Sequence, residues 1–410
     1  MDLVSAELPA KTLVVAVDPG KVSNRILLAN GERGLVGGPL SLPAQREGIE
    51  ELCRLIESNG AGERVIAIEA TGSLHLAWAT ELERRFPGSL RLFAPSETQA
   101  ARTQLGSRRF KDDDRDCAAL VSLARQGRGR AHRAGILEAL LDAVRHRRRL
   151  VSGRRVARQH LHHQLNGLCP ALSAPPGHGR SLELDSPTGG AVLACAVAFA
   201  GRPPSARSLI ARAPGRLART TARYWAERWR GCLGPPPDAE LRAERLGRDV
   251  ARWRALRGDI EAVEVQIEAL LAQSPGQVLT TLPGVAATRA AAFAVHALPI
   301  ERFASAEHLY SSTGLAPARY ESATVRRARA ISRQAPGERR DALMAIAWGL
   351  SQHCEAFRRR DRELRGRGMR PIEARVALAR HACRLGYRML QTQHPFDEER
   401  YARARHRRGR

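Results

Sequence analysis

The first third of the chain alternates short apolar runs with amphipathic stretches. Strand-like runs and helix-like periods follow one another here: strands are predicted at 13–17, 25–29, 64–68 and 91–94, and helices at 49–58, 74–86 and 113–126. Asn30-Gly31 is a hairpin signal, so the second strand should turn back toward residues 34–38. A hairpin meander followed by alternating strands and helices predicts a mixed α/β domain.

Residues 132–276 have the period of long helices. One apolar period begins at Ile136 and runs past Leu165, and helix resumes near Ala239 after a Pro/Gly-rich break at 170–187 and an irregular insert. Apolar residues then recur at spacings of 4, 3, 4 and 3, at Leu256, Ile260, Val263, Ile267 and Leu270. This heptad spacing predicts two long helices that pair within the chain or across a dimer. A plain helical bundle inside one subunit is the alternative.

Residues 277–395 predict a mostly helical C-terminal domain, with apolar helices through 343–350 and 376–390. The turn Leu282-Pro283-Gly284-Val285 and the Ala-rich helix after it resemble a helix-hairpin-helix. In that motif Gly284 and the helix N-terminus would grip a phosphate; a packing turn without a ligand is the alternative. The segment 396–410 is a basic tail that we expect to touch phosphates.

Positive charge dominates the composition. The formal net charge is +25, and of 67 basic residues only Lys11, Lys21 and Lys111 are lysines, which leaves 64 arginines. GC-rich codons account for arginine replacing lysine, but they do not account for the excess over 42 acidic residues. Such an excess favours a polyanionic partner, and no segment suits a membrane surface.

The cysteines and the apolar segments indicate in which cellular compartment the protein is expected. Seven cysteines are scattered without a CxxC pair, which argues against disulfides or structural zinc and favours a reducing cytoplasm. No basic region precedes the first apolar run, so no signal peptide is expected. The longest apolar stretch, residues 191–200, is too short to span a bilayer. We therefore expect a cytoplasmic protein with no membrane partner.

Carboxylates end two of the predicted buried strands. Asp18 follows the run 13–17, and Glu69 follows the run 64–68. A carboxylate at such a position is costly unless a cation meets it. Two strand tips and one helix face can gather carboxylates around a pair of divalent metals, which suits phosphodiester chemistry.

The acidic start of the helix at 113–126 supplies further candidates. At about 100° per residue, Asp113 and Asp116 can both face the sheet, whereas Asp112 lies well off that face and Asp114 points away from Asp116. A DxxD pair alone is also typical of a solvated helix start favoured by the helix dipole. In combination with the two strand-end acids, it predicts a site for Mg²⁺.

Three segments around these acids carry a resemblance to a known family: Val17-Asp18-Pro19-Gly20-Lys21, Ile68-Glu69-Ala70-Thr71-Gly72, and Lys111-Asp112-Asp113-Asp114-Arg115-Asp116-Cys117-Ala118-Ala119-Leu120. They resemble the DEDD transposases of bacterial insertion sequences, the family that includes the Piv-type DNA invertases. The resemblance continues in the C-terminal third through four short segments: Leu282-Pro283-Gly284-Val285, Tyr310-Ser311-Ser312-Thr313-Gly314-Leu315-Ala316-Pro317, Tyr320-Glu321-Ser322 and Ile331-Ser332-Arg333. It covers residues 12–130 and 277–395.

The resemblance implies an α/β plus α architecture. Residues 1–131 would form a RuvC-like (RNase H-like) nuclease domain, residues 132–276 a helical coiled-coil linker, and residues 277–395 a domain with a serine nucleophile. Carried over by position, four acids would hold two Mg²⁺ ions: Asp18, Glu69, Asp113 and Asp116. The serine would be Ser322, with Ser311, Ser312 and Ser332 as the other candidates.

The chain departs from the family pattern at two positions. Asp112 precedes the third acid, where the family commonly has a small or hydroxyl residue, and Ala323 follows the serine, where glycine is common. The resemblance also implies partners: DNA, a structured guide RNA that chooses target and donor DNA, and further copies of the chain in a dimer or tetramer. It implies association with a bacterial nucleoid.

Several basic or flexible residues beside these motifs are candidates for nucleic-acid binding: Lys21, Lys111, Gly284, Arg326, Arg327, Arg329 and Arg333. A second basic run, from Arg145 to Arg158, could follow a nucleic acid along the first long helix. The nearby His160, His162 and His163 have no acidic or cysteine partner in sequence, so we expect them on the helix surface.

These observations predict a DNA transposase or recombinase that cuts and rejoins strands through a phosphoserine intermediate. One alternative is a RuvC-like structure-specific endonuclease or junction resolvase, which would hydrolyse DNA without a covalent intermediate. The other is a non-catalytic nucleic-acid-binding scaffold. An Mg²⁺-dependent protein–DNA adduct separates the first hypothesis from both others.

Overall fold

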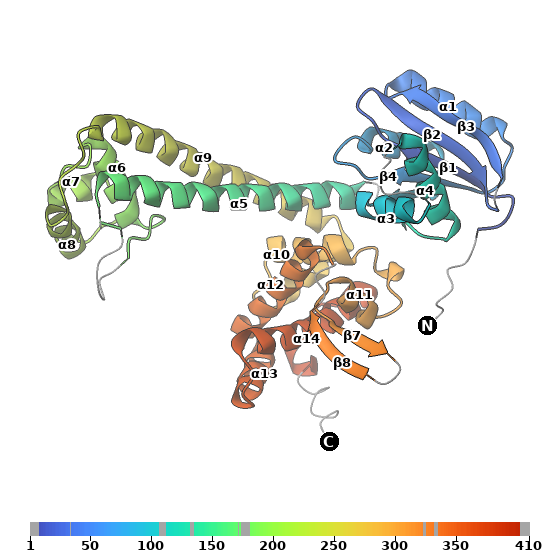
Figure 1. Cartoon of the computed structure of the whole chain (residues 1–410). Coiled ribbons are helices and arrows are strands. Elements are labelled where there is room, and N and C mark those ends of the chain that lie inside the picture. The colour runs from blue at the N-terminus through green and yellow to red at the C-terminus, as the bar shows by residue number, and fades with distance from the viewer. Residues whose placement is uncertain are drawn as a thin grey trace. The chain divides into compact units, whose positions relative to one another are not determined.

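The computed structural model describes residues 8–32, 34–105, 112–131, 135–170, 172–173, 181–322, 325–331 and 335–401. The chain divides into two compact units, Met1–Gly135 and Ile136–Arg410. The first unit is mixed α/β, and helices dominate the second (Figure 1).

The first unit is built on one six-stranded sheet. Its strands are β1 (Leu13–Asp18), β2 (Ser23–Asn30), β3 (Leu35–Pro43), β4 (Arg64–Glu69), β5 (Leu90–Phe93) and β6 (Arg130–Ala131). The spatial order is β3-β2-β1-β4-β5-β6. The first three strands form an antiparallel meander, whereas β4 runs parallel to both β1 and β5. The predicted hairpin after Asn30 is confirmed by the pairing of β2 with β3.

Helices cover both faces of this sheet. They are α1 (Arg46–Ser58), α2 (Leu76–Arg85), α3 (Pro95–Leu105) and α4 (Asp113–Arg125). Along β1, Val15 and Val17 pack into a core with α1 and α2, while Val14 and Ala16 pack into a second core with α4. Successive strand residues point to opposite faces, and because both faces are covered the strand reads as a continuous apolar run. Helix α3 was not predicted, because its sequence has almost no apolar period.

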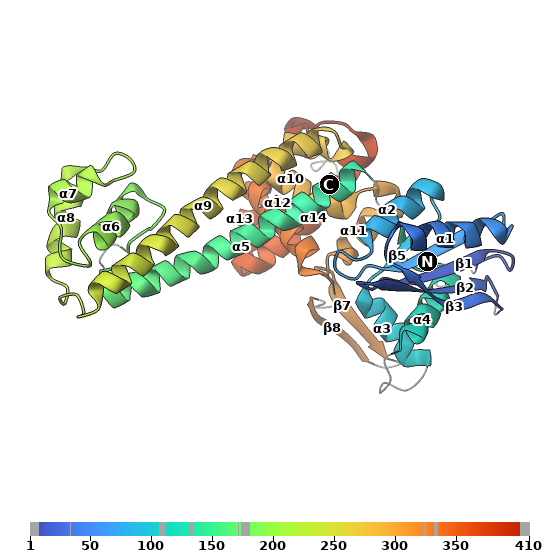
Figure 2. The ribbon, with the colours of Figure 1, turned by 90° about the horizontal axis from the view of Figure 1, so that it is seen from above.

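The second unit begins with a pair of long helices. Helices α5 (Ile136–Leu168) and α9 (Ala239–Ala272) lie side by side along their lengths (Figures 1 and 2). Val263 and Ile267 of the heptad seam are buried in this pairing, and Ile260 and Leu270 are half-buried. The predicted pairing of two long helices is therefore found within the chain.

The insert between the long helices is folded, contrary to the expectation of an irregular segment. It contains α6 (Pro187–Ala198), α7 (Ala206–Ala211) and α8 (Arg219–Arg230), which pack with the adjoining ends of α5 and α9 around Trp225 and Trp229. We call this part the tip lobe. Helix α6 is apolar on nearly all sides and buried, so it has no amphipathic period that would reveal a helix.

The C-terminal part is helical, as predicted, with one added hairpin. Its elements are η1 (Pro275–Thr281), α10 (Ala287–Ala297), η2 (Ile300–Arg302), α11 (Ala306–Ser312), β7 (Pro317–Ser322), β8 (Val325–Ile331), α12 (Gly337–His353), α13 (Glu355–Gly366) and α14 (Pro371–Thr392). The antiparallel β7–β8 pair was not predicted, because the arginines in its sequence interrupt the alternation typical of strands. No helix among the described residues is long and apolar enough to cross a membrane.

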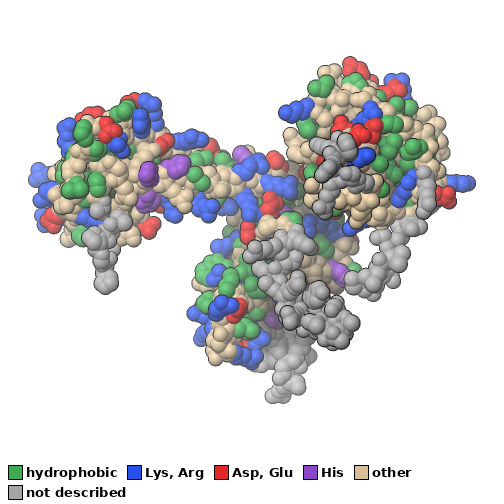
Figure 3. All heavy atoms as spheres, in the orientation of Figure 1, with side chains coloured by type: hydrophobic (Ala, Val, Ile, Leu, Met, Phe, Trp, Pro, Cys, Tyr) green, Lys and Arg blue, Asp and Glu red, His purple; other side chains and the backbone are tan. Residues whose placement is uncertain are grey.

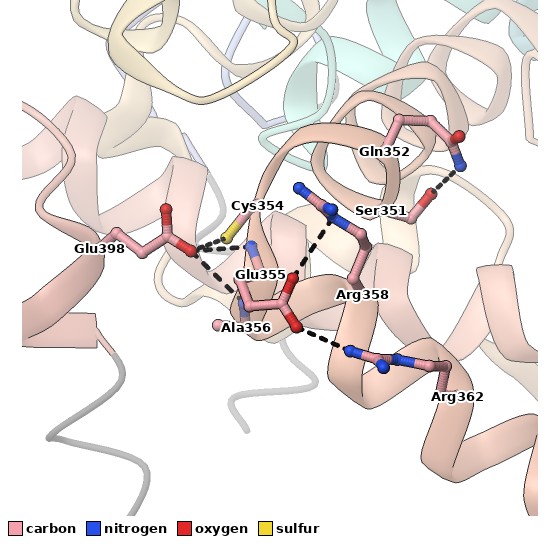
Figure 4. A network of polar contacts seen from close by, with 8 residues as sticks. All are labelled: Ser351, Gln352, Cys354, Glu355, Ala356, Arg358, Arg362 and Glu398. Atoms are coloured by element: carbon pink, nitrogen blue, oxygen red, sulfur yellow. Dashed lines mark hydrogen bonds and ion pairs between the residues drawn. The ribbon is translucent and has the colours of Figure 1, made fainter.

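A distant carboxylate caps helix α13 (Figure 4). Glu398 Oε1 accepts hydrogen bonds from the backbone N–H groups of Glu355 at 2.8 Å and Ala356 at 3.4 Å, and from the Cys354 thiol at 3.3 Å. Because the first N–H groups of a helix have no partner within it, Glu398 replaces the local cap that α13 lacks. The segment after α14 is thereby fixed to the C-terminal helices.

Candidate metal centre and nucleic-acid contacts

The alternation of side chains along two parallel strands directs two carboxylates toward the same helix. Asp18 ends β1 and Glu69 ends β4, and these strands pair in parallel with Val17 opposite Ile68. Val14 and Ala16 point to the α4 face, as does Ala67 of β4. By the two-residue period of a strand, Asp18 and Glu69 continue those rows and face α4.

The four aspartates at the start of α4 have three different structural roles. Asp112 is the N-cap, and its side chain accepts from the backbone N–H of Asp114. Asp114 forms an ion pair with Arg25 of β2 at 2.5 Å, and the Arg25 guanidinium lowers the pKa of that carboxyl. Asp113 and Asp116 remain, and they face the strand tips.

Three carboxylates meet at this point. Asp18, Asp113 and Asp116 each offer a carboxylate oxygen, and these atoms all lie within 4.8 Å of one another. Asp18 is half-buried, Asp113 is exposed and Asp116 is buried. Glu69 is not part of this group; its Oε1 accepts a hydrogen bond from the Thr71 hydroxyl at 2.5 Å. The structure thus brings together three of the four acids and leaves Glu69 at the adjacent strand tip.

Negative charge is concentrated in this cluster. Asp116 is only 4 % exposed and forms an ion pair with Arg102 of α3. Like charges this close repel one another, and the repulsion is strongest where water is excluded. Carboxylate oxygens are the donors that hard divalent cations such as Mg²⁺ prefer. The donor set therefore fits one or two such ions.

Two supporting residues were missed by the sequence analysis. Arg102 lies on α3, which was not predicted, and no spacing in sequence links it to Asp116. Thr71 donates a hydrogen bond to Glu69 and lies only two residues after it in the Glu-Ala-Thr-Gly segment. Because threonine hydroxyls commonly bond to groups close in sequence, this hydrogen bond could have been predicted.

The candidate serines lie in or beside the β7–β8 hairpin. Ser322 is the last residue of β7 and pairs in register with Val325. Arg326, Arg327 and Arg329 lie on β8; the side chains of this hairpin, like Ser332, Arg333 and Lys111 as a whole, lie outside the described residues. Of the other candidates, Ser312 donates its hydroxyl hydrogen to the Leu309 carbonyl, a bond typical of a helix end, and Ser311 is exposed beside it.

Gly284 occupies a tight helix-to-helix turn. Its φ is +73°, and a Cβ atom there would lie 2.7 Å from the Gly349 carbonyl oxygen and 2.3 Å from His353 Cδ2, both of α12. Arg289 of α10 donates to the Gly284 carbonyl at 2.6 Å. Close packing against α12 is therefore enough to explain why residue 284 is a glycine.

Several arginines of the basic run on α5 form ion pairs with acidic residues elsewhere in the chain. Arg147 pairs with Glu264, Arg148 with Asp341 and Arg154 with Asp185, so these pairs connect α5 to three other segments. Lys21, by contrast, is exposed in the turn after β1. His160, His162 and His163 of α5 belong to no group of potential metal ligands among the described residues.

Comparison with models of known protein families gives a match in the C-terminal part. Residues 276–362 match the model of the Transposase IS116/IS110/IS902 family. This segment runs from η1 into α13 and includes both Gly284 and Ser322. No curated protein matches the chain. The match supports a transposase or recombinase of an insertion sequence, which acts on DNA.

Proposed function

We propose that the protein is a DNA transposase whose N-terminal unit is a RuvC-like nuclease and whose C-terminal part supplies a serine nucleophile. The observation that carries the nuclease assignment is the cluster of Asp18, Asp113 and Asp116 within 4.8 Å. A three-strand meander joined to parallel β-α-β strands, as in this sheet, is the arrangement that an RNase H-like fold requires. Glu69, at the neighbouring strand tip, would complete the set of four acids.

The three clustered acids, with Glu69, would hold Mg²⁺. Bound there, Mg²⁺ supplies positive charge to the scissile phosphate and to the leaving oxygen. The exposed Lys21 would offset further phosphate charge without occupying a metal coordination position. Arg102 would keep the buried Asp116 oriented while the other carboxylates bind.

The serine would conserve bond energy during strand exchange. In the proposed step, Ser322 Oγ forms a bond to phosphorus, its proton passes to a nearby base, and the deoxyribose oxygen leaves and gains a proton. A hydroxyl of the new strand then attacks the same phosphorus, and Ser322 is released. Strands are rejoined without ATP because each ester bond replaces another.

The wider assembly is part of the proposal. The excess of basic residues supports a nucleic-acid partner, and exposed apolar residues on the long helices, such as Val151 and Val265, leave a surface for a second copy of the chain. A structured guide RNA and a dimeric or tetrameric assembly follow from the family resemblance.

The test is a cleavage assay with labelled element-end DNA and Mg²⁺. We expect the wild type to give a covalent protein–DNA adduct, and Ser322→Ala to lose it. Ser312→Ala is the matched control, because its hydroxyl is already engaged within its helix. Asp18→Asn should abolish cleavage while leaving salt-dependent DNA binding in place.

Two outcomes would replace this function with another. Clean hydrolysis by Ser322→Ala would support a structure-specific nuclease or junction resolvase. Unchanged binding with no Mg²⁺-dependent cleavage by the wild type, on several DNA substrates, would support a non-catalytic scaffold.

A further inference from the structure

The tip lobe has an unusual charge composition. From the N-cap of α6 to the residue before Asp238, residues 186–237 contain one acidic residue, Glu227, and eight arginines: Arg202, Arg207, Arg212, Arg216, Arg219, Arg223, Arg228 and Arg230. The flanking Asp185 and Asp238 pair with Arg154 of α5 and Arg242 of α9. Of the eight arginines, all except Arg228 are exposed. The lobe is therefore a concentrated region of positive charge at the far end of the long helices (Figure 1).

Codon bias does not explain this concentration, because the adjoining helix lacks it. Helix α9 contains six arginines, but seven acidic residues balance them. Three of its six arginines are engaged in ion pairs: Arg242 pairs with Asp238, Arg248 with Glu244 and Arg257 with Glu261. A general preference for arginine would affect both segments alike, so the loss of acidic residues is specific to the tip lobe.

Five of the eight arginines of the tip lobe form no ion pair with another described residue. Arg202 pairs with Glu240 at 3.0 Å, Arg212 stacks over Phe199 and Arg228 stacks over Trp225. Within the described part of the chain, no ion pair engages the remaining five, which are Arg207, Arg216, Arg219, Arg223 and Arg230. An external anion is the partner that these side chains lack.

The core of the lobe fixes one row of these arginines on α8. Trp225 and Trp229 are 4 % and 1 % exposed, and the Trp229 indole N–H donates to the Gly201 carbonyl at 2.9 Å. Arg219, Arg223 and Arg230 fall within about 40° of one another on the helical wheel, in an exposed row about 120° from these tryptophans. Lys and Arg side chains lie along the outer edge of the lobe in Figure 3.

The start of α8 adds a further feature that favours anions. Its N-cap, Ala218, provides no side-chain acceptor, and its first turn contains no acidic residue. Free N–H groups and the positive end of the helix dipole therefore face the same region as Arg219.

We infer that the tip lobe is a second DNA-binding surface, which holds the phosphate backbone of duplex DNA through the α8 row of Arg219, Arg223 and Arg230. Helix α5 has 33 residues, so at about 1.5 Å per residue the lobe lies some 50 Å from the base of the long helices. Contacts made there read no bases; they hold the phosphate backbone and so help to position the DNA. The inference rests on the proposed function for the choice of DNA as the polyanion.

The first test compares two triple variants of the full-length protein that lose the same charge. Arg219→Gln, Arg223→Gln and Arg230→Gln remove the proposed contacts, whereas Arg242→Gln, Arg248→Gln and Arg257→Gln remove arginines that are already paired on α9. Affinity for a fluorescent duplex is measured against salt concentration in EDTA, where no cleavage is needed.

Each lost phosphate contact lowers the slope of log K against log salt by about 0.9, so the slope for the α8 triple should fall by about 2.7. Relative to 1 M salt, this makes binding about 500-fold weaker at 0.1 M salt. The α9 triple should change far less. Equal losses in the two triples would overturn the inference, since net charge alone would then explain both.

A second test locates the contact on wild-type protein. Phenylglyoxal modifies accessible arginines, and peptide mass spectrometry reports its extent at Arg219, Arg223 and Arg230 with and without duplex DNA. We expect the duplex to protect them at least fivefold. Absence of protection would overturn the inference, and protection by an RNA hairpin but not by the duplex would overturn the assignment to DNA. Neither assay depends on cleavage, so each can fail or succeed independently of the proposed transposase chemistry.

Discussion

Replacing Asp113 by asparagine should stabilise the metal-free protein and remove its response to Mg²⁺. Asp113 is exposed and has carboxylate oxygens of Asp18 and Asp116 within 4.8 Å, while Arg102 offsets the charge of Asp116. The substitution relieves the repulsion between the Asp113 and Asp18 carboxylates. At this separation it is about 1 kcal/mol at the dielectric constant of water, and about 3 kcal/mol at an effective value of 20. Exposure of Asp113 favours the lower figure.

Mg²⁺ should reverse this order of stability. An ion that binds only the folded state with a dissociation constant near 1 mM adds about 1.4 kcal/mol at 10 mM. The wild type should gain this, and Asp113→Asn should gain little, since a ligand is lost. Glu50→Gln is the matched control: it removes an exposed carboxylate from α1 of the same unit, and should show neither effect.

Hydrogen exchange of the β1 and β4 amides measures the stability of each protein with and without Mg²⁺, because these strands report on the N-terminal unit alone. The reasoning would be refuted if Asp113→Asn proved less stable than the wild type in EDTA. It would also be refuted if Mg²⁺ protected both proteins equally.

Three further predictions concern the rest of the chain. Glu398→Ala should destabilise the C-terminal helices by about 1 kcal/mol through loss of the α13 cap, as urea unfolding would detect, whereas Glu398→Gln keeps an acceptor and should cost less; equal losses would contradict the capping role. Gly284→Ala should lower the free energy of unfolding by about 2–4 kcal/mol, because of the positive φ and the contact with α12, as thermal or urea unfolding would measure. Gly337→Ala, which has open space around its Cβ, should not destabilise the protein. A Gly284→Ala protein as stable as the wild type would show that the turn is not tightly packed. Burial raises the pKa of Cys195 and Cys354 to about 11 and of Cys169 and Cys383 to about 12, so iodoacetamide at pH 8 should label the half-buried Cys232 first, and prior labelling of any of these four would contradict this. Because these folded-state pKa values exceed the ordinary value of 9.0, the thiols favour folding below pH 9 and that contribution should fall as the pH rises toward 12.

Much of the N-terminal unit was predictable because its strands are short, apolar and bounded by clear turns. Each predicted strand there corresponds to an observed one, and the hairpin after Asn30 forms as its sequence indicates. The acids Asp18 and Glu69 could be assigned to strand tips because they end apolar runs. The face of α4 could be chosen because helical periodicity distinguishes Asp113 and Asp116 from their acidic neighbours.

Other features required tertiary information. Helix α3, which supplies Arg102, has little apolar period, and α6 is buried on almost every side, so neither presents an amphipathic pattern. The pairing of β7 with β8 depends on contacts between strands rather than on alternation within either. The arginines of α5 could be recognised as basic, but only the fold reveals that Arg147, Arg148 and Arg154 are paired with distant acids.

Calorimetric titration of the full-length protein with Mn²⁺, a spectroscopically and thermodynamically tractable substitute for Mg²⁺, tests the carboxylate centre most directly. The account predicts saturable binding by the wild type and its loss in a variant that carries Asp18→Ala and Asp113→Ala together. Equal Mn²⁺ binding by the variant and the wild type would contradict it.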